Sequence, residues 1–236
     1  MKRRSFLFAA AAAAASSLGS GPAFAQKPMK IGVIGSGRIG STIGALWVKA
    51  GHEVMFSDRD PEAVKRAVDG LGARARTGSV QEAVAFGDAI LIAVPYMALP
   101  AIQQQVGEQL KGKVVIDPNN PVASRDGEMG AQAREKGAGV STAALLPGAR
   151  VARAFNSWGY AVMGREANRP APRMAIPVAA DDPVALKVGM QLVNDAGFDA
   201  VAAGSLAASK AFDLGSSVSG RVLTAPELRQ ALQLKP

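Results

Sequence analysis

Cysteine is absent from the sequence, and histidine occurs once, as His52. Without cysteine the chain has no disulfide, no thiolate metal ligand and no cysteine nucleophile. Zinc sites need clustered ligands at short spacings, and His52 has no such neighbours along the sequence. It lies in a turn between an expected helix and an expected strand. We therefore predict a structural role for His52 and no metal site.

Aromatic residues are few, at 5% of the chain, and the formal net charge of +8 comes from basic residues that are scattered. Nucleic-acid-binding proteins usually gather their basic residues into a patch with interleaved aromatics. We therefore expect no nucleic-acid partner. After the N-terminal segment, no apolar run has the length of a membrane span, so we expect no membrane-spanning segment once that segment is removed. A homodimer is left open.

The N-terminal segment has the three parts of an export signal. Lys2-Arg3-Arg4 precedes an apolar, alanine-rich stretch over residues 8–18, and Ala23-Phe24-Ala25 closes the segment. This order predicts a cleavable signal peptide over residues 1–25, and the paired arginines indicate the twin-arginine type. Its removal lowers the net charge from +8 to +5. We predict a periplasmic protein exported in the folded state, and an uncleaved membrane anchor is the competing interpretation.

A glycine-rich turn lies between an apolar strand-like run and a helix-like stretch. It reads Gly35-Ser36-Gly37-Arg38-Ile39-Gly40. In dinucleotide-binding folds the first glycine allows a sharp turn, the second lets pyrophosphate approach the backbone, and the third lets the helix pack closely on the sheet. The helix N-terminus then offers N–H groups to the phosphates. We predict a nucleotide cradle made by these six residues; a plain strand-to-helix turn is the alternative.

Strand-like and helix-like segments alternate over the first two thirds of the chain, which is typical of a parallel sheet in an α/β fold. We expect strands over 30–34, 53–57, 73–76, 89–94, 114–116 and 151–155, and helices over 39–50, 61–71, 79–86 and 141–146. This pattern predicts a doubly wound parallel sheet, the NAD(P)-binding Rossmann fold, over residues 26–156. Ligands of such sheets bind at the carboxyl ends of the strands.

The remaining residues, 157–236, predict a small α/β extension packed on the same domain. Strands are expected over 174–179 and 199–203, and helices over 183–196 and 224–232. Asp182 precedes the first of these helices as an expected N-cap, and Thr224 with Glu227 has the spacing of a capping box, as do Ser79 and Glu82 earlier in the chain.

The residues that follow the second strand decide which nicotinamide nucleotide is favoured. An acidic side chain there accepts hydrogen bonds from ribose hydroxyls, whereas an arginine suits a 2′-phosphate. The sequence Ser57-Asp58-Arg59-Asp60 contains both types. Arg59 with Ser57 favours NADP, because a guanidinium binds phosphate in a bidentate manner. Asp58 and Asp60 would repel a 2′-phosphate and therefore argue for NAD. On balance NADP is preferred, and NAD stays open. A third interpretation is that Arg59 is a solvated turn residue.

Two further segments follow strands that should end near the cofactor. Val94-Pro95 follows the fourth strand, and Asn119 lies in the Asp117–Pro121 loop after the fifth. Asn119 could bond a carboxamide or a substrate carbonyl, although asparagine beside proline is also ordinary turn chemistry. Trp158 follows the sixth strand and suits either a stacking role or the core. The possible proton donors show no recognisable arrangement, so no catalytic residue is assigned: Tyr96, Tyr160, Lys210 and Asp213.

Taken together, motifs spread along the chain resemble a known family. They are the glycine loop 35–40, the segments 51–54 and 57–59, Ile92-Ala93-Val94-Pro95, the loop 117–121, Ala154-Phe155-Asn156 and Ala203-Gly204-Ser205-Leu206. In this order they resemble the NADPH-dependent deazaflavin-coenzyme (F420) reductases and their NADP-binding relatives. The resemblance implies that the glycine loop, Ser57 and Arg59 hold NADP and that Val94 and Pro95 line the nicotinamide side. The family's second-strand loop is rich in Ser and Arg, and Asp58 and Asp60 depart from that pattern.

From the residues and the resemblance we expect an NADP(H)-binding oxidoreductase. It would transfer hydride between nicotinamide and a second redox cofactor, such as a deazaflavin or flavin, or a small organic acceptor. Hydride transfer between stacked rings needs little acid–base help from side chains, which suits the scarcity of such groups. The alternative is an exported NAD(P)-binding sensor or accessory subunit without turnover.

Overall fold

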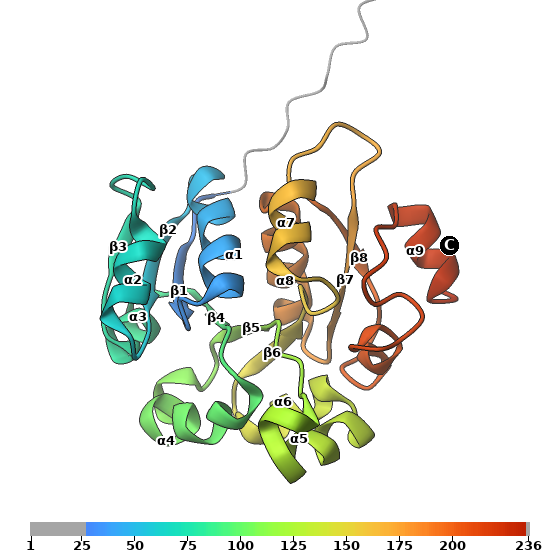
Figure 1. Cartoon of the computed structure of the whole chain (residues 1–236), viewed down its shortest axis with the longest axis horizontal. Helices are drawn as coiled ribbons and strands as arrows, with labels where there is room; N and C mark the ends of the chain where they lie inside the picture. The colour runs from blue at the N-terminus through green and yellow to red at the C-terminus, as the bar shows by residue number, and fades with distance from the viewer. Residues whose placement is uncertain (1–26, 235–236) are drawn as a thin grey trace, which may run out of the picture.

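The computed structural model describes residues 27–234, which form one mostly parallel sheet with helices on both faces (Figure 1). The predicted signal peptide, residues 1–25, lies outside the described residues. The strands are β1 (Lys30–Ile34), β2 (Glu53–Ser57), β3 (Ala75–Thr77), β4 (Ala89–Ile92), β5 (Val114–Asp117), β6 (Arg150–Arg153), β7 (Ala175–Ala180) and β8 (Asp199–Ala202). The helices are α1 (Arg38–Lys49), α2 (Pro61–Val68), α3 (Val80–Phe86), α4 (Leu99–Leu110), α5 (Ala123–Lys136), α6 (Ala138–Leu145), α7 (Tyr160–Glu166), α8 (Pro183–Asp195) and α9 (Ala225–Ala231), with 3₁₀ turns η1 (Tyr96–Ala98) and η2 (Ala208–Phe212).

The strand order is β3-β2-β1-β4-β5-β6-β7-β8. All pairs are parallel except β6 with β7, which are antiparallel and paired through Ala152 with Ala180 and Arg153 with Ala179. The expected doubly wound α/β fold is confirmed. The C-terminal strands β7 and β8 extend the same sheet with reversed direction after α7, which packs against α1.

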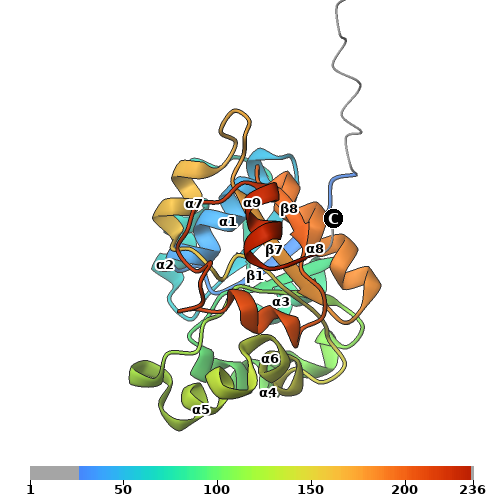
Figure 2. The same ribbon diagram turned by 90° about the vertical axis from the view of Figure 1, so that its right-hand side faces the viewer.

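The strands alternate their side chains between two cores. In β4, Ala89 and Leu91 join the core beneath α1 and α8, and Ile90 and Ile92 join the core beneath α3 and α4. Strands that are buried on both faces are continuously apolar, which explains the run Ala89–Ile92. Figure 2 shows α4, α5 and α6 gathered away from α1, α7 and α8. A third cluster covers β7 and β8 with residues from the C-terminal segment.

Helix caps follow the sequence closely. Asp60 accepts a hydrogen bond from Glu62 N, Asp182 accepts one from Ala185 N, and Ser79 and Glu82 form the predicted capping box. The pKa of Glu82 is lowered, mainly because its carboxylate accepts a hydrogen bond from the backbone N–H of Ser79. The hydrogen bond with the Ser79 side chain lowers the pKa further. Within residues 27–234, no helix combines the length and the apolar character that crossing a membrane requires.

Three helices were not predicted, namely α4, α5 and α7. Helix α4 carries buried Leu99, Ile102, Val106 and Leu110 at helical spacing, so its pattern was available. Helix α5 is polar and is interrupted at Gly127, where φ is +59°, which conceals its periodicity. Helix α2 ends at Val68 rather than at residue 71, because Gly70 and Gly72 adopt positive φ.

Candidate functional site

The glycine loop joins the carboxyl end of β1 to α1, and its three glycines meet different surroundings. Gly35 has φ of +94°, and a Cβ there would collide with the carbonyl of Ala93. A Cβ on Gly40 would collide with the carbonyl of Gly35. At Gly37, φ is −67° and a Cβ would meet nothing within 4 Å. Packing within the protein therefore requires the outer two glycines, and the space beside Gly37 is available to a ligand.

Helix α1 begins at Arg38 without a side-chain cap, because its N-cap residue is Gly37. The first N–H groups of an α-helix lack partners within the helix and carry a partial positive charge. Here they lie next to the exposed residues Gly37 and Arg38. This end of α1 is therefore suited to an anion such as pyrophosphate.

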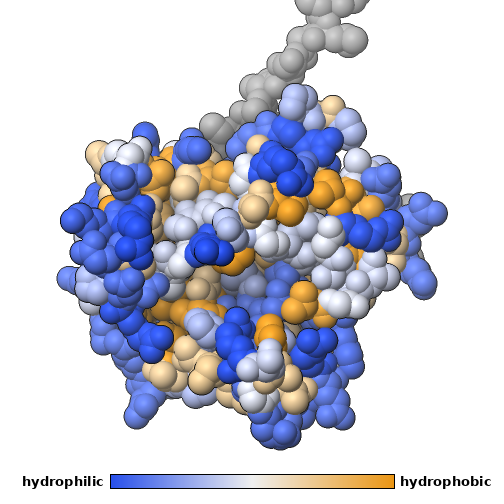
Figure 3. All heavy atoms as spheres, viewed as in Figure 1, coloured by the Kyte–Doolittle hydropathy of each residue, from blue (hydrophilic) through white to orange (hydrophobic). Residues whose placement is uncertain are grey.

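Two cavities meet at the glycine loop and share Gly37, Ala93, Val94 and Pro95. The larger has a volume of about 490 Å³ and continues past the carboxyl ends of β5 and β6. The smaller, of about 210 Å³, continues toward the carboxyl end of β2 and the start of α4. Figure 3 shows the same face as Figure 1, hollowed near its middle. The cavities lie where the strand order reverses between β1 and β4, the usual ligand position in open α/β sheets.

At the end of β2, the three predicted specificity residues have different environments. Ser57 is fully buried, and its hydroxyl donates to the carbonyl of Val33 at 2.8 Å. Asp58 and Arg59 both line the smaller cavity. Asp58 Oδ2 accepts a hydrogen bond from Ser36 N at 2.7 Å, whereas Arg59 is exposed. Asp58 is thus fixed at the cavity wall, whereas the hydroxyl of Ser57 is bonded to the backbone of β1 and does not line the cavity.

Asn119 holds together the carboxyl ends of β4 and β5. Its Nδ2 donates to Ile92 O at 2.8 Å, and its Oδ1 accepts from Val94 N at 3.2 Å. Both polar atoms of the side chain are therefore used within the protein. Asn119 shapes the cavity by fixing the chain at Val94 and Pro95, which explains why β4 ends at Ile92 rather than at residue 94.

A buried ion network lies behind this wall. Arg153, fully buried at the end of β6, donates from Nη1 to Asp117 Oδ2 at 2.9 Å and from Nε to Asp213 Oδ1 at 2.8 Å. It also donates to the carbonyl of Asn119 at 2.9 Å. Since a buried charge must be paired, this network fixes the β5 loop and the C-terminal segment together beside the larger cavity.

Two residues of α5 that the sequence analysis missed contribute to the site. Asp126, whose side chain is fully buried, accepts hydrogen bonds from Met97 N at 3.2 Å and Val122 N at 2.7 Å. Arg125 pairs with Asp126 at 2.8 Å and lines the larger cavity. Asp126 therefore joins η1 to the segment that follows the β5 loop, and both Val122 and Arg125 of that segment line the larger cavity. A basic residue four positions after the Asp117–Pro121 loop was the available signal.

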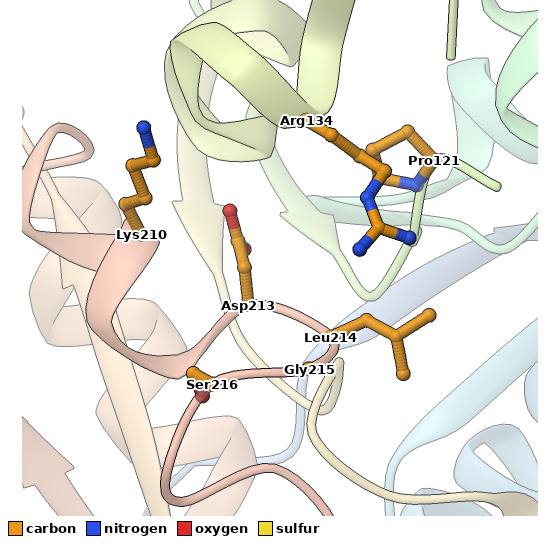
Figure 4. Close-up of a pocket in the computed structure, with 7 residues that line it drawn as sticks. All are labelled: Pro121, Arg134, Lys210, Asp213, Leu214, Gly215 and Ser216. Carbon is orange, nitrogen blue, oxygen red and sulfur yellow. The ribbon is translucent and has the colours of Figure 1, made fainter. Parts of the chain in front are cut away.

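The candidate proton donors lie elsewhere. Tyr96 is fully buried, and its hydroxyl lies beside Thr142 and Ser141 of α6; burial raises its pKa. Lys210 and Asp213 line a separate cavity of about 230 Å³. Figure 4 shows Asp213 between Lys210 and Arg134 in that cavity. Its carboxylate is bonded to Arg153, and Lys210 Nζ donates to Glu135 O at 2.7 Å.

The remaining aromatic and histidine candidates have structural contacts. Tyr160 lies under the guanidinium of Arg38, 5.2 Å from its ring centre. Trp158 lines the larger cavity but is 5% exposed, and its indole N–H donates to Arg221 O. His52 is buried, accepts from Met29 N at 3.0 Å and lies 3.1 Å from Asp195 Oδ2. The structural interpretation of His52 is confirmed. Across residues 27–234, His, Asp and Glu side chains form no cluster that could hold a metal ion.

Most predicted cofactor-binding residues converge on the two cavities, and their role in binding stays a prediction. Those at the larger cavity are Gly37, Arg38, Ile39, Val94, Pro95 and Asn119. Those at the smaller are Gly35, Gly37, Asp58, Arg59, Val94 and Pro95. Ser36, Gly40 and Ser57 are buried behind them.

Comparison with known proteins places this arrangement in context. Residues 30–121 match the family described as NADP oxidoreductase, coenzyme F420-dependent. The chain is 28% identical over 181 residues to the F420-dependent NADP reductase of Methanothermobacter thermautotrophicus, covering 70% of this chain and 76% of that protein. It is 27% identical over 187 residues to the metalloreductase STEAP3 of Rattus norvegicus, covering 77% of this chain. That match spans only 35% of the rat protein.

A solved structure of a hypothetical protein from Sinorhizobium meliloti has the same fold. Its TM-score is 0.70 at 23% identity, over 85% of this chain and 97% of that one. The glycine loop, the end of β2 and the Val94-Pro95 wall all lie within the matched residues 30–121. The family resemblance expected from the motifs is confirmed, because residues 30–121 match the model of the coenzyme F420-dependent NADP oxidoreductases and the chain is similar to an F420-dependent NADP reductase.

Proposed function

We propose that this protein is an oxidoreductase that binds a nicotinamide dinucleotide across the glycine loop. The observation that carries the proposal is the pair of cavities that meet at Gly37, where the uncapped start of α1 faces open space. A dinucleotide has two halves joined by pyrophosphate, and this arrangement offers a cavity for each half and an anion-binding helix end between them. Arg38, exposed at the same end of α1, adds a positive charge.

The nicotinamide half would lie in the larger cavity, against Val94 and Pro95, where the bound nucleotide supplies hydride chemistry. The wall at this position is fixed, because Asn119 bonds both Ile92 O and Val94 N. Trp158 and Leu214 contribute further apolar surface to the cavity. A rigid, largely apolar wall orients a flat ring and limits its contact with water.

The acceptor is proposed from the side chains that line the larger cavity. Within the described residues, no Asp, Glu, His, Lys or Tyr lines it. Reduction of a ketone or an imine usually recruits such a group as a proton donor. The lining therefore favours an acceptor that needs no proton from the protein, such as a deazaflavin or flavin, over a small carbonyl compound. The name of the relative from Methanothermobacter thermautotrophicus, an F420-dependent NADP reductase, supports a deazaflavin acceptor.

We also propose that the protein acts in the periplasm after export by the twin-arginine route. Support comes from the sequence of residues 1–25 alone, with its paired arginines, apolar stretch and A-x-A end. Export of a folded protein would allow the nucleotide to be loaded in the cytoplasm. Fractionation of cells that express the full-length chain tests this location, and retention of the protein in the cytoplasm contradicts it.

The test of the nucleotide site is Gly37→Asp. The new carboxylate enters open space, so the fold should survive, but it lies where pyrophosphate would bind. We expect the Kd for reduced nicotinamide nucleotide, measured by fluorescence titration, to rise at least about 100-fold, a difference of about 2.7 kcal/mol. Gly164→Asp is the matched control, because Gly164 on α7 is also exposed with open space around it. It should leave the Kd unchanged.

Two results separate the alternatives. An unchanged affinity of Gly37→Asp for the nucleotide would show that the nucleotide does not bind at the glycine loop. Tight binding by the unmodified protein without hydride transfer to any deazaflavin, flavin or small organic acceptor would support the sensor or accessory subunit instead.

A further inference from the structure

The carboxylate of Asp58, at the end of β2, is held in place by two hydrogen bonds. Its Oδ2 accepts a hydrogen bond from Ser36 N of the glycine loop at 2.7 Å, and its Oδ1 accepts one from Asp60 N at 3.0 Å. One carboxylate oxygen is thus bound to the glycine loop and the other to the turn before α2. Asp58 also lines the smaller cavity, next to Gly35 and Gly37. A negative charge is therefore held at the side of the cavity that would receive the adenosine ribose.

A fixed carboxylate at this place discriminates between two ligands. It accepts hydrogen bonds from the 2′- and 3′-hydroxyls of a ribose, as acidic residues at the end of the second strand do in NAD-binding folds. A 2′-phosphate would bring two further negative charges to the same place, and like charges at such short separations repel. The N–H of Ser36, a donor that a phosphate oxygen could use, already bonds Asp58.

The groups that would favour a 2′-phosphate are less well placed. The Ser57 hydroxyl is buried and donates to Val33 O. Arg59 is exposed, and within residues 27–234 it forms no ion pair that would fix its guanidinium. Lys65, on α2, lines a neighbouring cavity together with Asp58. Asp58, by contrast, lines the smaller cavity and is held by two hydrogen bonds, whereas Asp60 does not line that cavity.

We infer that Asp58 makes this protein select NAD(H), the dinucleotide without a 2′-phosphate, over NADP(H). The inference rests on the proposed nucleotide site and reverses the preference that the sequence motifs and the family name suggest. The glycine loop fits the pyrophosphate that both nucleotides share. The residues at the end of β2 do not fit the 2′-phosphate.

The experiment is a binding titration, independent of any acceptor. NADH and NADPH are each titrated into the unmodified protein, Asp58→Asn, Asp58→Ser and the control Asp60→Asn. The unmodified protein should bind NADH at least about 10-fold more tightly than NADPH. Asp58→Asn keeps an oxygen that can accept from Ser36 N but removes the charge, and it should shift the ratio of the two Kd values at least about 10-fold toward NADPH. Asp60→Asn removes the same charge two residues away and should leave that ratio unchanged.

The outcomes separate this inference from the function on which it rests. Equal affinities, or tighter NADPH binding by the unmodified protein, would overturn the inference and leave the nucleotide site standing. If the ratio of the Kd values for NADH and NADPH is the same in Asp58→Asn as in the unmodified protein, Asp58 is not the residue that selects between them. If neither nucleotide binds, both proposals fail. Thermal unfolding checks the fold of each variant, and Asp58→Ser replaces Asp58→Asn should the latter not fold.

Discussion

At the scale of single residues, the site depends on a few polar side chains that fix backbone rather than reach toward a ligand. Asp126 is the clearest example, because its buried carboxylate binds Met97 N and Val122 N and pairs with Arg125. Burial by itself raises the pKa of Asp126, but the hydrogen bonds from Arg125, Val122 and Met97 outweigh it and the pKa lies below its usual value of 3.8. The charged form is therefore the one that joins η1 to the segment that follows the β5 loop.

The lowered pKa has a defined consequence for stability. A carboxyl group whose pKa is lower in the folded state stabilises the fold above its unfolded pKa and loses that contribution as the pH falls through the folded value. Asp126→Asn should therefore have a lower Tm than the unmodified protein at pH 7, and the difference should shrink by pH 3. Thermal unfolding at both pH values measures it.

Glu128→Gln, an exposed carboxylate on the same helix, is the control and should leave Tm nearly unchanged at both pH values. A difference between Asp126→Asn and the unmodified protein that is as large at pH 3 as at pH 7 would contradict the assigned role of the carboxylate.

Residue types alone could not distinguish ligand-facing from structural side chains here. Ser57 and Asn119 have the polar groups of cofactor ligands, yet Ser57 bonds Val33 O and Asn119 bonds Ile92 O and Val94 N. All three partners are backbone atoms of a neighbouring strand or of the loop directly after it, and such pairing depends on strand register, which spacing along the chain does not reveal. The glycines were easier, because the turn and the close helix packing are local.

At the scale of elements, the position of the glycine loop depends on how closely α1 packs on the sheet. Gly44, buried on α1, lies directly against the ring of Phe56 on β2. A methyl group there would push α1 away from the sheet and move the loop that begins it. We expect Gly44→Ala to lower the free energy of unfolding by about 1–3 kcal/mol, the usual cost of overpacking, and to weaken nucleotide binding.

Gly107→Ala on α4 is the control, because the atoms nearest to a Cβ there belong to the flexible end of the Gln103 side chain. Chemical denaturation and nucleotide titration of both variants decide the point. Equal stability and equal affinity for the two would show that close contact between α1 and β2 does not position the loop.

Elements were predictable where their periodicity is plain. The apolar strands β1, β4 and β5 and the helices with Asp60, Ser79 or Asp182 at their start were found near their observed bounds. Helix α5, which supplies Arg125 and Asp126, was missed because polar residues dominate it and Gly127 interrupts it. The reversed direction of β7 was also not predictable, because the pairing of β7 with β6 is a tertiary contact that local residue patterns do not encode.

At the scale of the whole molecule, the fold brings four separate stretches of sequence to one edge of the sheet. The glycine loop comes from the end of β1, the specificity turn from β2, and the cavity wall from β4 and β5. The C-terminal segment reaches the larger cavity through Leu214, and the ion pair between the adjacent Asp213 and Arg153 holds this segment in place. The family match ends at residue 121, so this part of the cavity lies outside the matched residues.

The central claim is that a dinucleotide lies across Gly37, with one half in each cavity. A crystal structure of the protein with NADH tests it most directly. The account predicts pyrophosphate at the N-terminus of α1, the adenosine ribose hydroxyls on Asp58, and nicotinamide against Val94 and Pro95. Nucleotide bound elsewhere on the molecule, or a glycine loop that stays empty at saturating NADH and at saturating NADPH, would contradict it.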